Sequence, residues 1–302
     1  MPVSTKSTGK TAVRVARTPH RPRLVPTTAC DTAFRMTARR CIEDLTVNQV
    51  ATCRGDPAAL HRMRIALTRL RTAISFFSPI VADAQRAQIR RELKWLNACL
   101  GAVRDLDVAI ERLGNRRNAV GGNTRLSALD REVRDGHTKL ARALRSTRYR
   151  RLVNGTSAWV ESGSWSTEQG KQVARARACP IATFITYKLA RWQRKLLKKS
   201  RKLEEMGIRR RHQLRLRNKK LSYSLEFFKD LFPDKRYSRQ RLALKYLRRA
   251  QKSLGQLNDD ARARSLAAAS GVKVSRQKRE KQLIKAAAKA YRSLAALKPA
   301  FR

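Results

Sequence analysis

Acidic residues are scarce in this chain. Its 302 residues include 22 Asp and Glu against 70 Lys and Arg, which gives a formal net charge of +48. A charge this one-sided opposes compaction by self-repulsion unless anions bind among the positive groups. The composition therefore predicts a polyanionic partner, namely nucleic acid, inorganic polyphosphate or an anionic membrane surface, ahead of an acidic protein.

Cysteine and long apolar runs are also in short supply. The cysteines are scattered and form no C-x-x-C pair; they are Cys30, Cys41, Cys53, Cys99 and Cys179. This spacing argues against a disulfide framework or a zinc site and is typical of reduced thiols. No stretch of about 18 apolar residues is present, and the N-terminus lacks the apolar core of a signal peptide. We therefore expect a soluble, cytoplasmic protein without integral membrane association.

Histidine is rare, and the sequence offers no obvious ligand set for a metal. His20 and His137 are distant in sequence from His61 and His212, and no carboxylate cluster accompanies any of the four. We therefore expect no metal site and no cofactor. The carboxylates that look most suited to catalysis are expected instead to pair with arginine or to cap a neighbouring turn; they are Asp105, Asp107 and Asp259.

Residues 1–28 differ from the rest of the chain. They carry six Lys or Arg side chains and no acidic residue, together with several Thr and Pro. No apolar residue repeats there at helical or strand spacing, so we expect a disordered basic tail.

From residue 30 onward the apolar residues recur at helical spacing. One seam steps by three and four residues through Leu60, Met63, Leu67, Leu70, Ile74 and Phe77. The pair Asp56-Pro57 predicts its start and Pro79 its end. Two further seams run over 93–110 and 126–144, and more helices are predicted around 178–199, 209–231, 237–268 and 278–297. Asn154-Gly155 together with Ser162-Gly163-Ser164 predicts a long connection between the third seam and the later helices.

The sequence also repeats itself. His61-Arg62-Met63-Arg64-Ile65 recurs as His212-Gln213-Leu214-Arg215-Leu216, at an offset of 151 residues. The segment 100–105 recurs as 254–259, at an offset of 154 residues. Two matched signatures at nearly one offset predict two copies of a four-helix unit. The predicted fold is therefore all-α, with two antiparallel four-helix bundles over 29–165 and 166–302 related by a pseudo-two-fold internal repeat.

Each signature helix carries a polar stripe one position beyond its apolar seam. In the first copy the stripe consists of His61, Arg64, Thr68 and Arg71. In the second it consists of His212, Arg215, Lys219 and Ser222. Groups on such a stripe follow one another about every 5 Å, one helical turn, and guanidinium forks suit phosphate oxygens. The stripes predict a groove for a linear anion with closely spaced phosphates.

The repeated segments match a known pattern. H-x-x-R followed by an aliphatic residue occurs at His61 and His212, L-K-W-L occurs over 93–96, and L-G-x-x-R-D-x-D over 100–107, with L-G-x-L-N-D over 254–259. In these motifs, which span roughly 30–300, the chain resembles the CHAD domain family. The resemblance implies two four-helix bundles around a basic surface or cavity, inorganic polyphosphate as the ligand, and recruitment to polyphosphate granules.

The charge pattern and the resemblance together give a set of candidate polyphosphate-binding residues. They are His61, Arg62, Arg64, Arg69, Arg71, Arg91, Lys94, Arg104, His212, Arg215, Arg217, Lys219, Lys220, Lys245 and Arg248. Family members carry Arg where this chain has Thr68 and often where it has Ser222, so one basic group is missing from each half. His61 and His212 have an alternative role as neutral residues that join helices by hydrogen bonds.

Three functions fit these observations. The first is non-enzymatic binding of inorganic polyphosphate. The second is nucleic-acid binding, because charge neutralisation of phosphates needs no sequence readout. Against it, aromatic residues are 6% of the chain, few for stacking on single strands, and no helix-turn-helix, zinc-finger or RNA-recognition pattern is present. The third is hydrolysis of phosphoanhydrides, which the missing set of metal ligands disfavours.

Overall fold

The structure is a computed structural model that describes residues 23–114, 123–167, 170–231, 234–269 and 277–297. Within these ranges the secondary structure consists of α-helices and two short 3-10 helices, without a strand. The predicted all-α class is therefore confirmed.

The first half of the chain forms helices that pack closely around one another. Helix α3 packs against α1, α2 and α4, while α4 packs against α5 and α6 and α1 packs against α6. These helices are α1 (Cys30–Val47), α2 (Gln49–Cys53), α3 (Pro57–Phe76), α4 (Ala84–Gly114), α5 (Asn123–Arg145) and α6 (Thr147–Ser162).

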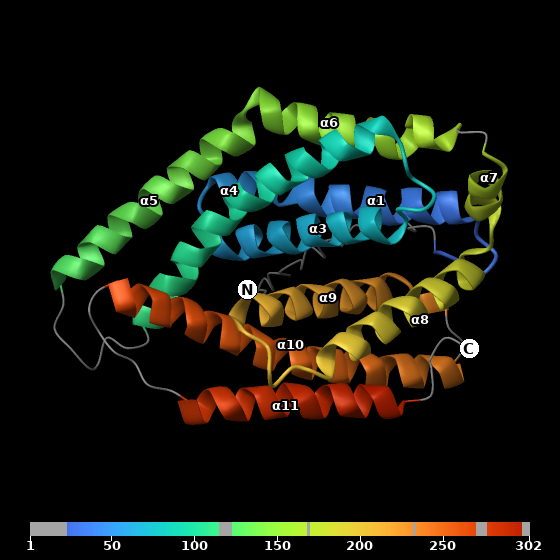
Figure 1. Ribbon diagram of the computed structural model, residues 1–302. Coiled ribbons are helices and arrows are strands. Elements are labelled where there is room, and N and C mark those ends of the chain that lie inside the picture. The colour runs from blue at the N-terminus through green and yellow to red at the C-terminus, as the bar shows by residue number, and fades with distance from the viewer. Residues whose placement is uncertain (1–22, 115–122, 168–169, 232–233, 270–276, 298–302) are drawn as a thin grey trace, which may run out of the picture.

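The second half forms its own group of helices. Helix α10 packs against α9 and α11, and α8 packs against α9 and α11. The elements are η1 (Ser164–Ser166), α7 (Lys171–Ala178), α8 (Ile181–Ser200), α9 (Ile208–Phe227), η2 (Lys229–Leu231), α10 (Asp234–Ala269) and α11 (Gln277–Ala296). The halves meet where α3 contacts α9 and where α1 contacts α7 and α8 (Figure 1). The pseudo-two-fold relation between the halves stays a prediction.

Local signals in the sequence explain where α3 begins and which face it buries. The Asp56 carboxylate accepts a hydrogen bond from the Ala58 backbone N–H at 2.7 Å, and Pro57 occupies the first turn. Such a cap satisfies a backbone donor that has no partner within the helix. The predicted seam is buried from Leu60 through Phe77, so the period of the apolar residues located this helix correctly.

The long connection predicted from Asn154-Gly155 to Ser164 begins later than predicted. Asn154 and Gly155 lie inside α6, which ends only at Ser162. The helix continues through them because its other face is buried through residues such as Leu152 and Trp159, and tertiary packing outweighs the weak helix propensity of Asn-Gly. The predicted helix over 178–199 corresponds to α8, which begins after the Cys179-Pro180 step, while the short helix α7 before that step was not predicted.

The prediction of a disordered tail over residues 1–28 is wrong for residues 23–28. Residues 1–22 of it lie outside the described residues, but 23–28 run along the start of α8. The backbone N–H of Ile181 donates to Thr28 O at 2.8 Å, and that of Ala182 donates to Pro26 O at 3.2 Å. The first N–H groups of a helix have no acceptor within it. The segment before α1 supplies those acceptors and is ordered as a result.

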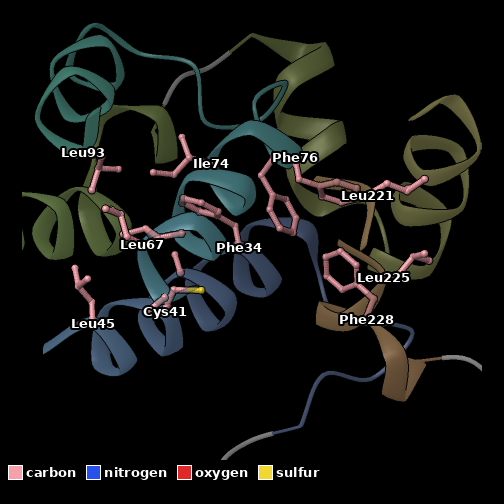
Figure 2. Close-up of a cluster of buried hydrophobic side chains, with 14 of the residues drawn as sticks. Phe34, Cys41, Leu45, Leu67, Ile74, Phe76, Leu93, Leu221, Leu225 and Phe228 are labelled. Carbon is pink, nitrogen blue, oxygen red and sulfur yellow. The ribbon is translucent and has the colours of Figure 1, made fainter. Parts of the chain in front are cut away.

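An aromatic cluster fills the core where the two halves meet. The ring of Phe76 on α3 lies 5.2 Å from that of Phe228 and 5.4 Å from that of Trp192 on α8. Phe77 stacks on Phe184 of α8 at 5.7 Å between ring centroids. Figure 2 shows Phe76 and Phe228 beside Leu221 and Leu225 of α9, with Phe34 of α1 nearby. Buried aromatic contact therefore fixes α3 relative to α8 and α9.

The core of the second half includes a buried polar centre at Asn218. Its side-chain amide donates to Leu247 O at 2.9 Å and to the Gln251 side chain at 3.0 Å, and its carbonyl oxygen accepts from Tyr291 Oη at 3.2 Å. These bonds join α9 to α10 and α11. At the sequence offset of 151 residues, the corresponding residue is the apolar Leu67, which is also buried.

Candidate anion-binding site

The two histidine-bearing helices lie side by side. Helices α3 and α9 contact each other, and Figure 1 shows them adjacent at the centre of the molecule. Their polar stripes come together there. The side chains that act on one another there are His61 and Arg64 of α3, Arg104 of α4, and Arg215 and Lys219 of α9, which we call the central cationic patch.

The pKa of Lys219 shows that these charges act on one another. Its pKa falls from 10.5 to about 8, first because it is partly buried, then because of the positive charges of Arg215 and Arg64. Arg64 belongs to the first half and Lys219 to the second, so this coupling reaches across the interface. The Lys219 ammonium lies 5.6 Å from the centre of the Tyr223 ring. A cation over an aromatic face is held in place at low cost.

The same group of positive charges acts on His61. Its pKa is lowered from the ordinary value, chiefly by partial burial and then by Arg104, Arg64 and Lys219. Burial and these cationic neighbours therefore both favour the neutral imidazole. A bound anion would offset those neighbours and favour the protonated form. Arg64 has Asp105 as a partial counter-charge, with 3.8 Å between Nη1 and Oδ1.

His212 has a different environment from His61. Its Nδ1 is 2.9 Å from Oδ1 of Asn258 on α10, so this histidine joins two helices by a hydrogen bond. At the offset of 154 residues, Asn258 matches Arg104, the residue beside His61. Arg215 lies one turn further along α9, and its buried Nε has no hydrogen-bond partner.

A second group of cations lies further along α3 and α9. The pKa of Lys220 is lowered by burial and by Arg71, Arg90 and Arg217. Burial and Arg90 also lower the pKa of Arg71. We call these four side chains the distal cationic cluster. The central patch and this cluster both draw their side chains from α3, α4 and α9.

Arg69 connects α3 to α9 by packing. Its guanidinium carbon lies 5.2 Å from the centre of the Phe227 ring, and its buried Nε has no hydrogen-bond partner. Arg69 was predicted to contact phosphate. In the structure it lies against an aromatic ring at the interface between the halves.

Other predicted residues have their surroundings outside the central patch, although Arg62 also helps to lower the pKa of His61. Arg62 donates to the Asn48 side chain at 2.8 Å and lies 3.6 Å from Asp56, so it faces the junction of α1 and α2. Arg91 and Lys94 are exposed on α4.

Two more of the predicted residues belong to a surface pocket of about 680 Å³ along α10. The pocket is lined by Lys245 and Arg248 together with Arg241, Arg249 and Lys252. Arg248 pairs with Glu226 of α9 at 3.0 Å.

Sequence reasoning missed Arg90 and Asn258. Arg90 precedes Arg104 by 14 residues, almost four helical turns, so both occupy one face of α4. That spacing could have identified Arg90. No signal in the sequence alone indicates that Asn258 contacts His212.

The predicted pairing of the carboxylates with arginine holds for Asp105, which lies beside Arg64. Asp107 instead forms a hydrogen bond with His137, at 2.8 Å between Oδ1 and Nε2. His137 therefore does have a carboxylate neighbour, because α4 and α5 pack together, which sequence distance hides. Among the described residues, no group of three or more His, Cys, Asp or Glu side chains is placed to hold a metal ion.

The architecture and the surface define this chain as an all-helical protein with a cationic surface where its two halves meet. The model of the CHAD domain matches residues 37–268, more than half of the chain, and the chain belongs to the CHAD domain family. No curated protein matches the chain. No helix in the described part of the chain combines the length and the apolar character that crossing a bilayer requires.

Two solved structures are similar to this one. The crystal structure of the CHAD domain from the plant Ricinus communis has a TM-score of 0.71 and 25% sequence identity, covering 93% of this chain and 96% of that chain. PptA from Streptomyces chartreusis has a TM-score of 0.53 and 15% identity, covering 91% of this chain and 98% of that one. The likeness to PptA concerns the fold alone.

Proposed function

We propose that this protein binds inorganic polyphosphate without hydrolysing it, and that the polymer lies along the central cationic patch and the distal cationic cluster. The observation that carries the proposal is the mutual lowering of pKa across the two halves, in which Arg64 acts on Lys219 and Lys219 acts on His61. Cations held this close gain most from a ligand that carries a negative charge on every repeating unit.

The linear spread of the charges supports a polymer over a single phosphate. His61, Arg64 and Arg71 follow one face of α3 over nearly three turns, and Lys219 and Lys220 approach them from α9. Arginine forks bind phosphate oxygens through two hydrogen bonds, while lysine acts as a mobile point charge. The pseudo-two-fold repeat belongs to the same proposal, since each half contributes one histidine-bearing helix.

Binding without catalysis is supported by the partners of the acidic side chains. Asp105 faces Arg64, and Asp107 faces His137, so these two carboxylates are engaged with cationic or titrating groups. Thr68 and Ser222 donate their hydroxyl groups to Arg64 O and Asn218 O, which uses them within their own helices. We further propose a cytoplasmic location with recruitment to polyphosphate granules, as the net charge of +48 and the family both favour.

Parallel salt titrations test the choice of polyanion. The full chain is titrated with long-chain polyphosphate and with duplex DNA at equal concentrations of phosphate. We expect tighter binding of polyphosphate, with an affinity that falls steeply with salt because phosphate contacts release counterions. Equal or tighter binding of DNA would replace this proposal with nucleic-acid binding. Release of phosphate from polyphosphate in the presence of Mg²⁺ would overturn the non-enzymatic part.

A paired variant tests the position of the site. His61→Ala with Arg64→Ala should weaken polyphosphate binding by about tenfold or more, because hydrogen bonds to charged groups contribute about 1.5–3 kcal/mol each. The control, Arg131→Ala with Arg134→Ala, removes two exposed cations on α5, which is more positive charge than the paired variant loses. Far-UV circular dichroism should show unchanged helicity for both. An equal loss of affinity in the two variants would mean that overall charge, and not the patch, determines binding.

A further inference from the structure

Two cysteines from opposite halves of the chain lie across an antiparallel bridge. Cys30 is the first residue of α1, and Cys179 lies between α7 and α8. The backbone N–H of Cys30 donates to Cys179 O at 3.1 Å, and the neighbouring residues Ala29 and Pro180 form the antiparallel bridge itself. On the other side of this bridge, the N–H of Ile181 donates to Thr28 O at 2.8 Å.

This backbone arrangement determines how the two thiols are placed. Residues directly opposite each other in an antiparallel pair have Cα atoms about 4.5–5.5 Å apart, and their side chains leave the same face. Disulfides form between Cα atoms about 4.4–6.8 Å apart. Residues paired in this way therefore have the backbone spacing that a disulfide requires, and both thiols are free here.

The side chains confirm that the two sulfur atoms are neighbours. The pKa of Cys30 is raised to about 12, first by burial and then by Cys179, and a hydrogen bond between the two side chains is among the causes. Cys30 is 0% exposed, whereas Cys179 is partly exposed. A solvent-borne oxidant therefore reaches Cys179 first.

We propose that Cys30 and Cys179 form a reversible disulfide that joins α1 of the first half to the α7–α8 connection of the second when the protein meets a hydroperoxide. The Cys179 thiolate attacks one oxygen of hydrogen peroxide, which breaks the O–O bond and gives a sulfenic acid and hydroxide, and the hydroxide takes up the proton released by the Cys179 thiol to give water. The Cys30 sulfur then attacks the Cys179 sulfur and displaces its hydroxyl group, and the Cys30 proton leaves with it as water. Two thiols are oxidised by two electrons in total, and one peroxide is reduced to two waters.

The test uses the full chain treated with hydrogen peroxide, alkylated and digested with trypsin without reductant. We expect mass spectrometry to find peptide 24–35, which contains Cys30, joined to peptide 178–188, which contains Cys179. The link should disappear with dithiothreitol and in Cys179→Ser. The matched control Cys99→Ser, which changes another partly exposed cysteine, should retain it.

A thermal measurement provides an independent readout. A cross-link that closes a long loop restricts the unfolded chain, so the oxidised protein should melt roughly 5 °C or more above the reduced one, with no such difference in Cys179→Ser. The substitution is made at Cys179 because this residue is partly exposed, whereas a change at the buried Cys30 could by itself destabilise the fold. Over-oxidation of Cys179 to a sulfinic acid without a link, or links that join other cysteines equally often, would overturn the proposal.

Discussion

Lys219 gives the sharpest test of the cationic patch, because its charge changes in an accessible range of pH. With a pKa of about 8, this lysine is roughly nine-tenths charged at pH 7 and one-tenth charged at pH 9. Bound phosphates offset the charges of Arg215 and Arg64 and return its pKa toward the ordinary 10.5. Binding then takes up a proton whenever the free lysine is neutral.

The sign and the size of the effect follow from linkage. Because the bound state holds more protons than the free state above pH 8, polyphosphate affinity falls as the pH rises through that value. For one coupled lysine, the fall between pH 7 and pH 9 is about tenfold, and binding at pH 8 takes up about half a proton. Calorimetric titrations in buffers of different ionisation enthalpy measure both quantities.

Two substitutions at this position separate Lys219 from every other titrating group. Lys219→Arg stays charged throughout and should bind with an affinity that is nearly independent of pH over this range. Lys219→Met should bind more weakly at pH 7 and also lose the pH dependence. Lys188 of α8 also has a pKa of about 8 but is present in both variants. If Lys219→Arg keeps the tenfold fall, Lys219 does not contact the ligand and the patch is misplaced.

Three further predictions concern other parts of the molecule. Thr68→Arg should strengthen polyphosphate binding several-fold in the same titration, since it adds a cation to the α3 stripe. Gly163→Ala should lower the melting temperature, because a Cβ there would lie 2.6 Å from Trp159, whereas Gly155→Ala on α6 meets open space and should stabilise by about 0.5–1 kcal/mol. Phe76→Ala should lower the free energy of unfolding by about 3–5 kcal/mol in urea denaturation, because it empties the core between the halves.

The parts of the fold that sequence predicts well are those set by local periodicity. The seam from Leu60 to Phe77 located α3, and Asp56 marked its start, because helical period and capping act within a few residues. The predicted connection at Asn154-Gly155 is wrong because the helix there depends on contacts between residues distant in the sequence. The intrinsic preference of Asn-Gly is for a turn, but the burial of Trp159 and its neighbours keeps the helix intact, and burial is a property of the whole fold.

The candidate site likewise has parts that the sequence predicts and parts that it does not. The stripe on α3 could be predicted, and the structure places its cations against those of α9. The partners of individual side chains could not be predicted. Asn258 holds His212, and Phe227 lies under Arg69, only because helices distant in sequence pack together. Arg90 joins the surface for the same reason, although its spacing from Arg104 already placed both on one face of α4.

The aromatic cluster between the halves has a consequence for how a ligand is received. Phe76 and Phe77 hold the C-terminal end of α3 against α8 and the end of α9. The spacing of the two histidine-bearing helices is therefore set by ring contacts and not by the mutual repulsion of their cations. The positions of the two helices are therefore fixed before polyphosphate binds. The entropy lost on association therefore falls on the flexible polymer, which must adopt the path that the protein already presents.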